Sequence, residues 1–185
     1  MPFHKTDIPG LLVFEPNVFE DSRGYFFESY NEKIFREAGI DFRWVQDNQS
    51  SSAYGVIRGL HYQLPPFAQS KLIRVLRGKI LDAVVDIRKG SSTFGKSYCK
   101  VLSAKNKGQL FIPKGFAHGF AVLSEKAEVL YKCDEFYNKE SESGIIYNDP
   151  ALNIDWQIPA KDAIISDKDK QLPLLKDCNN IFVYQ

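Results

Sequence analysis

The sequence has 185 residues, of which 44% are hydrophobic and 14% aromatic, so one domain of this length can bury a substantial core without disulfides or a structural metal. Its 24 Lys and Arg residues balance 23 Asp and Glu residues, for a net charge of +1. A surface balanced in this way gives no reason to expect non-specific binding to nucleic acid or to anionic membranes, and any phosphate-bearing ligand must be held by a few placed cations.

The N-terminal segment carries no targeting signal that we can identify. It has no long apolar run and contains Pro9 and Gly10 early, which a signal peptide would not. No stretch of the chain approaches the roughly 18 consecutive apolar residues that are needed to cross a bilayer. We therefore expect a cytoplasmic location and no membrane partner.

The first predicted elements are two β-segments and a helix. Residues 11–19 and 24–30 alternate in polarity, as strands do. Ser29 followed by Glu32 forms a capping box, Phe35 belongs to an apolar stripe, and Gly39 stands where a C-cap belongs. The pattern predicts a short helix between these caps.

Short strands dominate the chain up to about residue 148. The predicted segments are 70–88, 96–104, 109–124 and 127–137, and Gly78 divides the first of them into two strands. The remainder is rich in Pro, Asp and Lys and predicts turns and short helices. Many short strands in one domain favour a jelly roll or closed barrel, because closure removes unpaired strand edges. The mouth of such a barrel is the natural ligand site.

Two of the three histidines lie in recognisable motifs. His118, in IPKGFAHGF, completes the P-x-G-x-x-H pattern of the second cupin motif. His61, in RGLHYQLPP, occupies the place of the first cupin motif, which in metal-binding members reads H-x-H followed by a glutamate. Here Gln63 replaces the second histidine, and no glutamate follows it closely.

This departure argues against a metal centre. A first-row divalent ion in this architecture needs three or four imidazole and carboxylate ligands, and only His61 and His118 remain, with a weak amide donor at Gln63. The three cysteines, Cys99, Cys133 and Cys178, are widely spaced and odd in number. No two of them have the spacing of a metal site, and we do not expect a disulfide framework. We therefore expect no metal and no cofactor.

Side chains alone could carry proton-transfer chemistry around His61. A histidine with a pKa near 6.5 suits a general base at neutral pH. Lys71 could stabilise an enolate oxygen, and a tyrosine on a later strand, Tyr131 or Tyr137, could return a proton to the opposite face. Base, opposed acid and cation are the groups needed to invert a carbon next to a ketone.

These residues also have plain structural interpretations. A lone strand histidine is more often hydrogen-bonded than catalytic, tyrosines are common in β-protein cores, and Lys71 could be a solvated strand residue. Arg58 and His61 differ in strand parity, so they share a face only if Gly59 marks a bulge. The residues alone do not choose between these alternatives.

The segment RGLHYQLPPFAQSKLIRVLRG closely resembles the dTDP-4-dehydrorhamnose 3,5-epimerase family, a branch of the cupin superfamily. The resemblance runs nearly end to end, in the blocks 21–31, 45–52, 55–63, 83–96, 112–124 and 165–169. It implies an all-β, cupin-type jelly-roll barrel with a few short helices, in a single domain spanning 1–185 with an extension from about 148.

By this resemblance the chain would invert C3 and C5 of dTDP-4-dehydro-6-deoxy-glucose, giving dTDP-4-dehydro-β-L-rhamnose. The base corresponds to His61, the carboxylate that orients it to Asp169, with Asp167 as an alternative. The proton donor corresponds to Tyr131, and the cation facing the C4 carbonyl to Lys71. The resemblance implies further substrate contacts, with the cations serving the diphosphate, at Arg23, Phe26, Glu28, Gln46, Asn48, Arg58, His118, Tyr137, Glu142 and Lys168.

The resemblance also implies a homodimer in which N-terminal strands are exchanged and the segment around Arg23 completes the neighbour's pocket. Three alternatives remain open. The chain could invert only C3 or only C5 of another deoxysugar nucleotide, it could be a non-catalytic sugar-binding cupin, or it could be a metal-dependent cupin oxygenase or isomerase.

Overall fold

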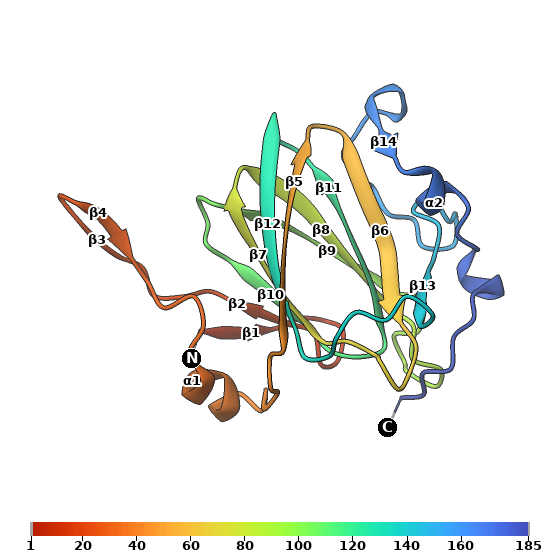
Figure 1. Ribbon diagram of the computed structural model, residues 1–185, viewed down its shortest axis with the longest axis horizontal. Helices are drawn as coiled ribbons and strands as arrows, with labels where there is room; N and C mark the ends of the chain where they lie inside the picture. The colour runs from red at the N-terminus through yellow and green to blue at the C-terminus, as the bar shows by residue number, and fades with distance from the viewer. Residues whose placement is uncertain (1, 185) are drawn as a thin grey trace.

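The computed structural model describes residues 2–184 and consists mainly of β-strands in two facing sheets (Figure 1). One sheet contains β1 (Phe3–Lys5), β2 (Leu12–Phe14), β5 (Gln46–Ala53), β7 (Lys71–Arg77), β10 (Gln109–Ile112) and β12 (Lys126–Cys133). The other contains β6 (Val56–Gln63), β8 (Lys79–Asp86), β9 (Ser97–Ser103), β11 (Phe116–Val122), β13 (Glu142–Gly144) and β14 (Ile164–Ile165).

The sheets have the order β1-β2-β10-β7-β12-β5 and β13-β6-β11-β8-β9, with β14 added to β6. All of the strand pairs are antiparallel except β14 with β6, which is parallel. Sequence-adjacent strands often lie in different sheets, as in a jelly roll. The predicted all-β, cupin-type barrel is confirmed.

Alternating side chains fill the space between the sheets. Along β8, Ile80 and Val84 join the inner core, whereas Leu81 and Val85 point to the outer face of their sheet. That outer face is also covered, by the C-terminal segment with η1 (Ala160–Asp162), α2 (Asp167–Lys170) and η2 (Leu175–Asp177), which runs along the sheet beside β6 (Figure 1). A strand covered on both faces is apolar throughout, which explains the near-continuous hydrophobic run of β8.

Gly78 separates two strands, as predicted, but β7 and β8 belong to different sheets. The glycine therefore turns a corner of the barrel and does not close a hairpin. Its φ is +77°, and a Cβ at this position would lie 2.1 Å from the carbonyl oxygen of Lys126. Only glycine fits this corner.

The predicted helix is present as α1 (Glu32–Glu37), but its N-terminal cap is Asn31 and not Ser29. The Asn31 side chain accepts a hydrogen bond of 3.1 Å from the backbone N–H of Lys33. The prediction of a Ser29 capping box was wrong because asparagine caps as well as serine and stands closer to the apolar stripe. At the other end Gly39, with φ +81°, follows the last helical turn as expected.

The strands β3 (Phe19–Asp21) and β4 (Gly24–Phe26) form a separate hairpin that extends away from the barrel (Figure 1). Two cation–π contacts connect the segment to the barrel: Lys107 lies over the ring of Tyr25, and Arg74 over the ring of Phe27. No helix within residues 2–184 is long and apolar enough to cross a membrane.

Candidate active site

The inward-facing positions of the barrel change from apolar to polar toward one end. Along β7, Val75 and Ile73 belong to the core, and Lys71, two residues further on the same face, lines a cavity. Along β12, Val129 is a core residue and Tyr131 lines the same cavity. The two-residue period of each strand therefore carries its polar side chains to one end of the barrel.

Two adjoining cavities open there. The larger, of about 270 Å³, is lined by Gln46, Asn48, His61, Tyr62, Gln63, Gln69, Lys71, Tyr131, Tyr137 and Glu142. The smaller, of about 140 Å³, is lined by Ser50, Arg58, His61, Lys71, His118, Gly119, Phe120 and Tyr131. Three of these side chains belong to both: His61, Lys71 and Tyr131. They lie where the two cavities meet.

His61 is paired with a buried carboxylate. Its Nε2 lies 2.7 Å from Oδ1 of Asp169, whose side chain is 4% exposed. Ser166 caps α2 by accepting from the backbone N–H of Asp169, and Oδ2 of Asp169 accepts from the N–H of Gly59. Asp167 is exposed and pairs with Lys170. Of the two candidate carboxylates, Asp169 is therefore the one that contacts His61.

Burial by itself would raise the pKa of Asp169. The hydrogen bond and charge of His61, together with the N–H of Gly59, outweigh burial, and the net effect lowers the pKa below its usual value. The carboxylate is thus ionised at neutral pH and accepts the proton on Nε2 of His61. The second ring nitrogen, Nδ1, is left with its lone pair.

A bulge at Gly59 brings Arg58 and His61 to the same cavity. In the pairing of β6 with β11, His61 is opposite His118 and Arg58 is opposite Phe120. The step between these two pairs is three residues on β6 and two residues on β11, so β6 contains one extra residue. Gly59 has φ +118°. The interpretation of this glycine as a bulge is confirmed, and it removes the parity conflict between the two side chains.

Lys71 and Tyr131 are neighbours, with the Lys71 Nζ 5.9 Å from the centre of the Tyr131 ring. Burial lowers the pKa of Lys71, and the nearby Cys133, Asp82 and Glu142 oppose this only in part. Burial raises the pKa of Tyr131. The phenol therefore keeps its proton at neutral pH and is able to donate it.

The mouth of the larger cavity carries a chain of three polar side chains. The hydroxyl of Tyr137 donates to Oε2 of Glu142 (2.8 Å), and Nζ of Lys168 lies 2.6 Å from the same oxygen. Burial would raise the pKa of Glu142, but these two contacts lower it overall. Tyr137 lies beyond the end of β12 at Cys133, so its predicted place on a strand is wrong. Its backbone N–H instead donates to the side chain of Gln46.

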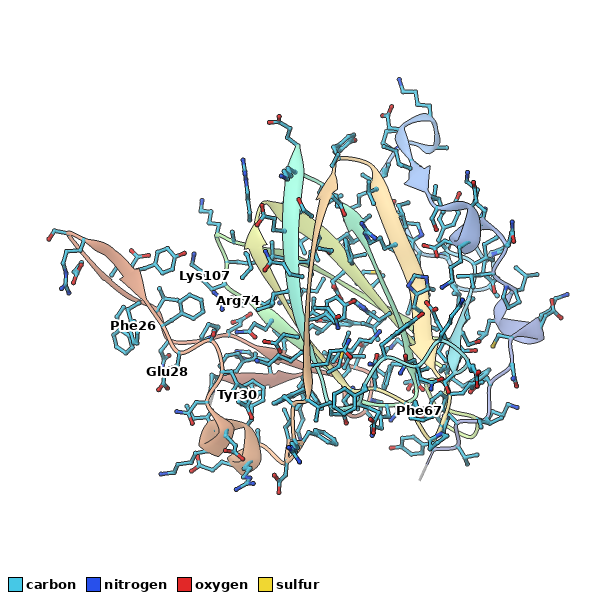
Figure 2. All side chains as sticks on the ribbon, in the orientation of Figure 1. Phe26, Glu28, Tyr30, Phe67, Arg74 and Lys107 are labelled. Atoms are coloured by element: carbon cyan, nitrogen blue, oxygen red, sulfur yellow. The ribbon has the colours of Figure 1, made fainter. Side chains whose placement is uncertain are left out.

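Four predicted contact residues line neither cavity in this chain. Lys168 contacts Glu142 at the mouth of the larger cavity, whereas Arg23, Phe26 and Glu28 lie on the N-terminal segment. Figure 2 shows Phe26 and Glu28 on the projecting N-terminal segment, away from the barrel. Phe26 is 68% exposed, Arg23 pairs with Asp21, and Glu28 accepts from the side chain of Asn31.

Sequence reasoning missed Asp82, whose Oδ2 lies 3.0 Å from Nε2 of His118. A carboxylate at an inward position of the apolar segment ILDAVVDI was the available signal.

Sequence reasoning also missed that the Gln63 amide is used to hold backbone groups. The Gln63 amide donates to the carbonyls of Phe67 and Phe136 and accepts from the N–H of Asn138, so its oxygen is already engaged.

The donor set at this end of the barrel does not fit a metal ion. The site offers the imidazoles of His61 and His118, and the Gln63 amide is held by backbone groups. Within residues 2–184 no three His, Cys, Asp or Glu side chains are grouped as a metal site would require.

Comparisons with known proteins agree with this geometry. The family model described as dTDP-4-dehydrorhamnose 3,5-epimerase matches residues 5–177. A dTDP-4-dehydrorhamnose 3,5-epimerase from Shigella flexneri is 55% identical over 166 residues, covering 89% of this chain and 91% of the relative. The crystal structure of a dTDP-6-deoxy-D-glucose-3,5-epimerase from Legionella pneumophila Philadelphia 1, in complex with dTDP-4-keto-L-rhamnose, superimposes with a TM-score of 0.94 at 46% identity, covering 99% of this chain and 98% of the other.

A 3'-monoepimerase from Streptomyces bikiniensis, in complex with dTDP-quinovose, has the same fold, with a TM-score of 0.87 at 34% identity over 94% of this chain and 87% of the other. The fold is therefore shared by enzymes described as acting at one carbon and at two. The extent of the family-model match and the high identity to relatives over most of their length decide the family. This chain belongs to the dTDP-4-dehydrorhamnose 3,5-epimerase family.

Proposed function

We propose that this protein inverts C3 and C5 of dTDP-4-dehydro-6-deoxy-glucose and releases dTDP-4-dehydro-β-L-rhamnose, without a cofactor. The observation that carries the proposal is the His61–Asp169 pair, which lies where the two cavities meet beside Lys71 and Tyr131. Membership of the family supplies the substrate class.

Each inversion needs a base, a stabilising cation and an acid. His61 takes a proton from the carbon next to the C4 ketone through Nδ1, because Nε2 is held by Asp169. The electron pair of the broken C–H bond moves into the C4 carbonyl and forms an enolate, whose oxygen Lys71 stabilises. Tyr131 then donates its hydroxyl proton to the same carbon from the opposite face. Proton exchange with solvent restores His61 and Tyr131 for the second carbon.

The remaining polar residues around the cavities are proposed to hold the nucleotide. Arg58 is the stronger candidate for the diphosphate, because a guanidinium forms two parallel hydrogen bonds to phosphate oxygens. Tyr137 is exposed at the mouth, where its ring can contact a base. Further contacts are proposed for the other polar residues that lie around the cavities: Gln46, Asn48, His118, Glu142 and Lys168.

We further propose that a second copy of the chain completes each site. The β3–β4 hairpin exposes three large aromatic side chains, Phe19 (65%), Tyr25 (60%) and Phe26 (68%), and such a patch on a projecting segment favours a partner surface. In a homodimer with exchanged N-terminal segments, Arg23 and Glu28 would reach the partner's cavity.

Mixing two inactive variants tests the exchange. A His61→Asn chain lacks the base, and an Arg23→Ala chain lacks the residue proposed to act in the neighbour. If each site draws on both chains, a refolded mixture regains activity, because some dimers contain one complete site. Activity that stays at the level of the separate variants, or a molecular mass in solution equal to that of one chain, would contradict the exchanged dimer.

Incubation of the enzyme and substrate in deuterated water tests the reaction. We expect NMR to detect deuterium at both C3 and C5, since each inversion replaces one carbon-bound proton with one from solvent. Exchange at a single carbon would instead assign the chain to the monoepimerases. Substrate binding without any exchange in the wild-type chain would leave a sugar-binding role, and undiminished exchange in the His61→Asn chain would contradict the choice of base.

A further inference from the structure

A second histidine–aspartate pair lies across the sheet from His61. His118 on β11 is the register partner of His61 on β6, and its Nε2 lies 3.0 Å from Oδ2 of Asp82 on β8. Both members are buried, since Asp82 has no exposed surface and His118 is 7% exposed. The cavities are thus bordered by two such pairs, and the reaction proposed above uses the aspartate of only one.

The Asp82 carboxylate is costly to bury. Its second oxygen, Oδ1, is inaccessible and has no hydrogen-bond partner within residues 2–184, and a buried polar atom without a partner is destabilising. The two strands do not need the pair to hold them together, because β8 and β11 are hydrogen-bonded in continuous register along the whole of β11. Strand pairing therefore does not account for the carboxylate.

The contact with Asp82 decides which ring nitrogen of His118 keeps its lone pair. A carboxylate oxygen accepts a hydrogen bond, and the 3.0 Å contact with Oδ2 of Asp82 therefore places a proton on Nε2 of His118. The neutral ring then has its lone pair on Nδ1, and Nδ1 makes no hydrogen bond to the described part of the chain. The ring lines the smaller cavity together with Arg58 and Lys71.

Among these neighbours, His118 supplies a hydrogen-bond acceptor, which the cations Arg58 and Lys71 do not. Arg58 and Lys71 have only donors, which suit the oxygens of a phosphate or a carbonyl. A sugar hydroxyl also has a proton to donate, and in a site lined by cations that proton needs an acceptor. Nδ1 of His118 is an acceptor on a ring that lines the same cavity.

We propose that Asp82 is a positioning residue that holds His118 in the Nε2–H tautomer, so that Nδ1 accepts a hydrogen bond from a hydroxyl group of the bound sugar. The proposal rests on the function proposed above, because it takes the ligand to be a sugar nucleotide. It assigns to the buried carboxylate a role in recognising the sugar, separate from the base pair of His61 and Asp169.

The first test measures the tautomer directly. The sequence contains only three histidines, so long-range ¹H–¹⁵N NMR spectra of the ¹⁵N-labelled, ligand-free protein at about pH 8, where an ordinary imidazole is neutral, resolve each ring. The His118 signals are assigned by their loss in His118→Asn. In the wild type we expect the proton on Nε2, and in Asp82→Asn, whose amide can donate to Nε2, a shift toward Nδ1–H. A wild-type ring protonated on Nδ1 overturns the proposal, even if no Asp82 variant folds.

The second test is a double-mutant cycle. Asp82→Asn should lower kcat/KM for the sugar nucleotide about 10- to 100-fold, the size expected for a hydrogen bond that involves a charged group. The same substitution in a His118→Asn background should change kcat/KM less than about 2-fold, because the ring it positions is gone. The Kd of dTDP, which lacks the hexose of the substrate, should stay within about 2-fold in Asp82→Asn. Additive losses, or a dTDP affinity that falls as far as kcat/KM, overturn the proposal.

Asp149→Asn is the matched control for burial. Asp149 is 5% exposed, accepts from the N–H groups of Ala151 and Leu175, and lies outside both cavities. This variant should lose stability and keep its kcat/KM, and an equal loss of kcat/KM in it would mean that the Asp82 effect is merely structural. If the wild-type chain does not turn over the substrate, the proposed function fails, and the tautomer measurement still decides the role of Asp82.

Discussion

Replacing Asp169 with asparagine should slow the reaction without unfolding the protein. The change removes one negative charge and keeps the shape of the side chain. The asparagine oxygen can still accept from the N–H of Gly59, as Oδ2 of Asp169 does now at 3.2 Å. What disappears is the charge-assisted contact of 2.7 Å with Nε2 of His61, which both orients the ring and stabilises the proton it gains.

The size of the effect follows from that contact. A hydrogen bond to a charged, buried partner contributes about 1.5–3 kcal/mol, and each 1.36 kcal/mol in the barrier changes the rate about tenfold. The expected loss in kcat is therefore about 10- to 150-fold. An asparagine amide that donates to Nε2 would also push the His61 proton onto Nδ1, the nitrogen that has to act as the base, and would move the loss toward the upper end.

Deuterium incorporation into the substrate, followed by NMR at saturating concentration, measures this loss as kcat, and the Kd of dTDP checks that the site is intact. Asp167→Asn is the matched control, since Asp167 is exposed, lies two residues away and pairs with Lys170. Its kcat should stay within about 2-fold of the wild type. A kcat for Asp169→Asn within the same range, or a comparable loss in Asp167→Asn, would refute the assignment of the pair.

Four other changes test separate parts of the structure. Lys71→Met should lower kcat about 10²- to 10³-fold by removing the cation at the enolate oxygen. Because burial lowers the pKa of Lys71, the wild-type rate should also fall as rising pH removes the proton of Lys71, with a midpoint below the ordinary lysine pKa of 10.5. A midpoint above 10.5 would contradict this. Gly59→Ala should destabilise the fold by about 3 kcal/mol or more, measured by urea unfolding. The reason is that φ is +118° and the new Cβ would lie 2.6 Å from the Cα of Gly119. A variant as stable as the wild type would contradict this by showing that the bulge can relax. Burial opposes ionisation of Asp86, but the hydrogen bonds from Arg88, Thr93 and Ser91 together outweigh it and lower the pKa. This carboxylate therefore stabilises the fold above the unfolded-state pKa of about 3.9, and the benefit is lost as the pH falls through the lower folded-state pKa. The difference in unfolding free energy between wild type and Asp86→Asn, about 3 kcal/mol at pH 7, should shrink in acid, and a difference that is constant with pH would argue against it. Treatment with a chelator should leave turnover unchanged, and a loss that added divalent ions restore would reinstate a metal site.

The strand pattern was predictable where the inward positions of a strand are mainly apolar, and it failed for β5, whose inward positions are polar. The segments that became β7, β8, β11 and β12 alternate in polarity or are apolar throughout, and they were identified. Strand β5, with the sequence QDNQSSSA, was missed because its inward positions, such as Gln46 and Asn48, are polar. A strand that exposes polar groups to a ligand lacks the hydrophobic period by which strands are identified, so pattern-based prediction fails at the functional site.

Most of the candidate site came from resemblance to a family, and local chemistry explains why. His61, Lys71 and Tyr131 each have an ordinary structural interpretation when seen as isolated strand residues. Their meaning depends on facing one cavity, which joins β6, β7 and β12 from two different sheets. Sequence spacing does not indicate that these strands meet.

By itself the sequence determined the fold class, the turn at Gly78 and the family, because these depend on short-range periodicity, on glycine backbone freedom and on blocks of matching residues. Only the tertiary structure decided which aspartate holds which histidine. Asp169 is 108 positions from His61, and Asp82 is 36 positions from His118. Contacts over such separations are made by the pairing of strands and the docking of the C-terminal segment, which local sequence preferences do not specify.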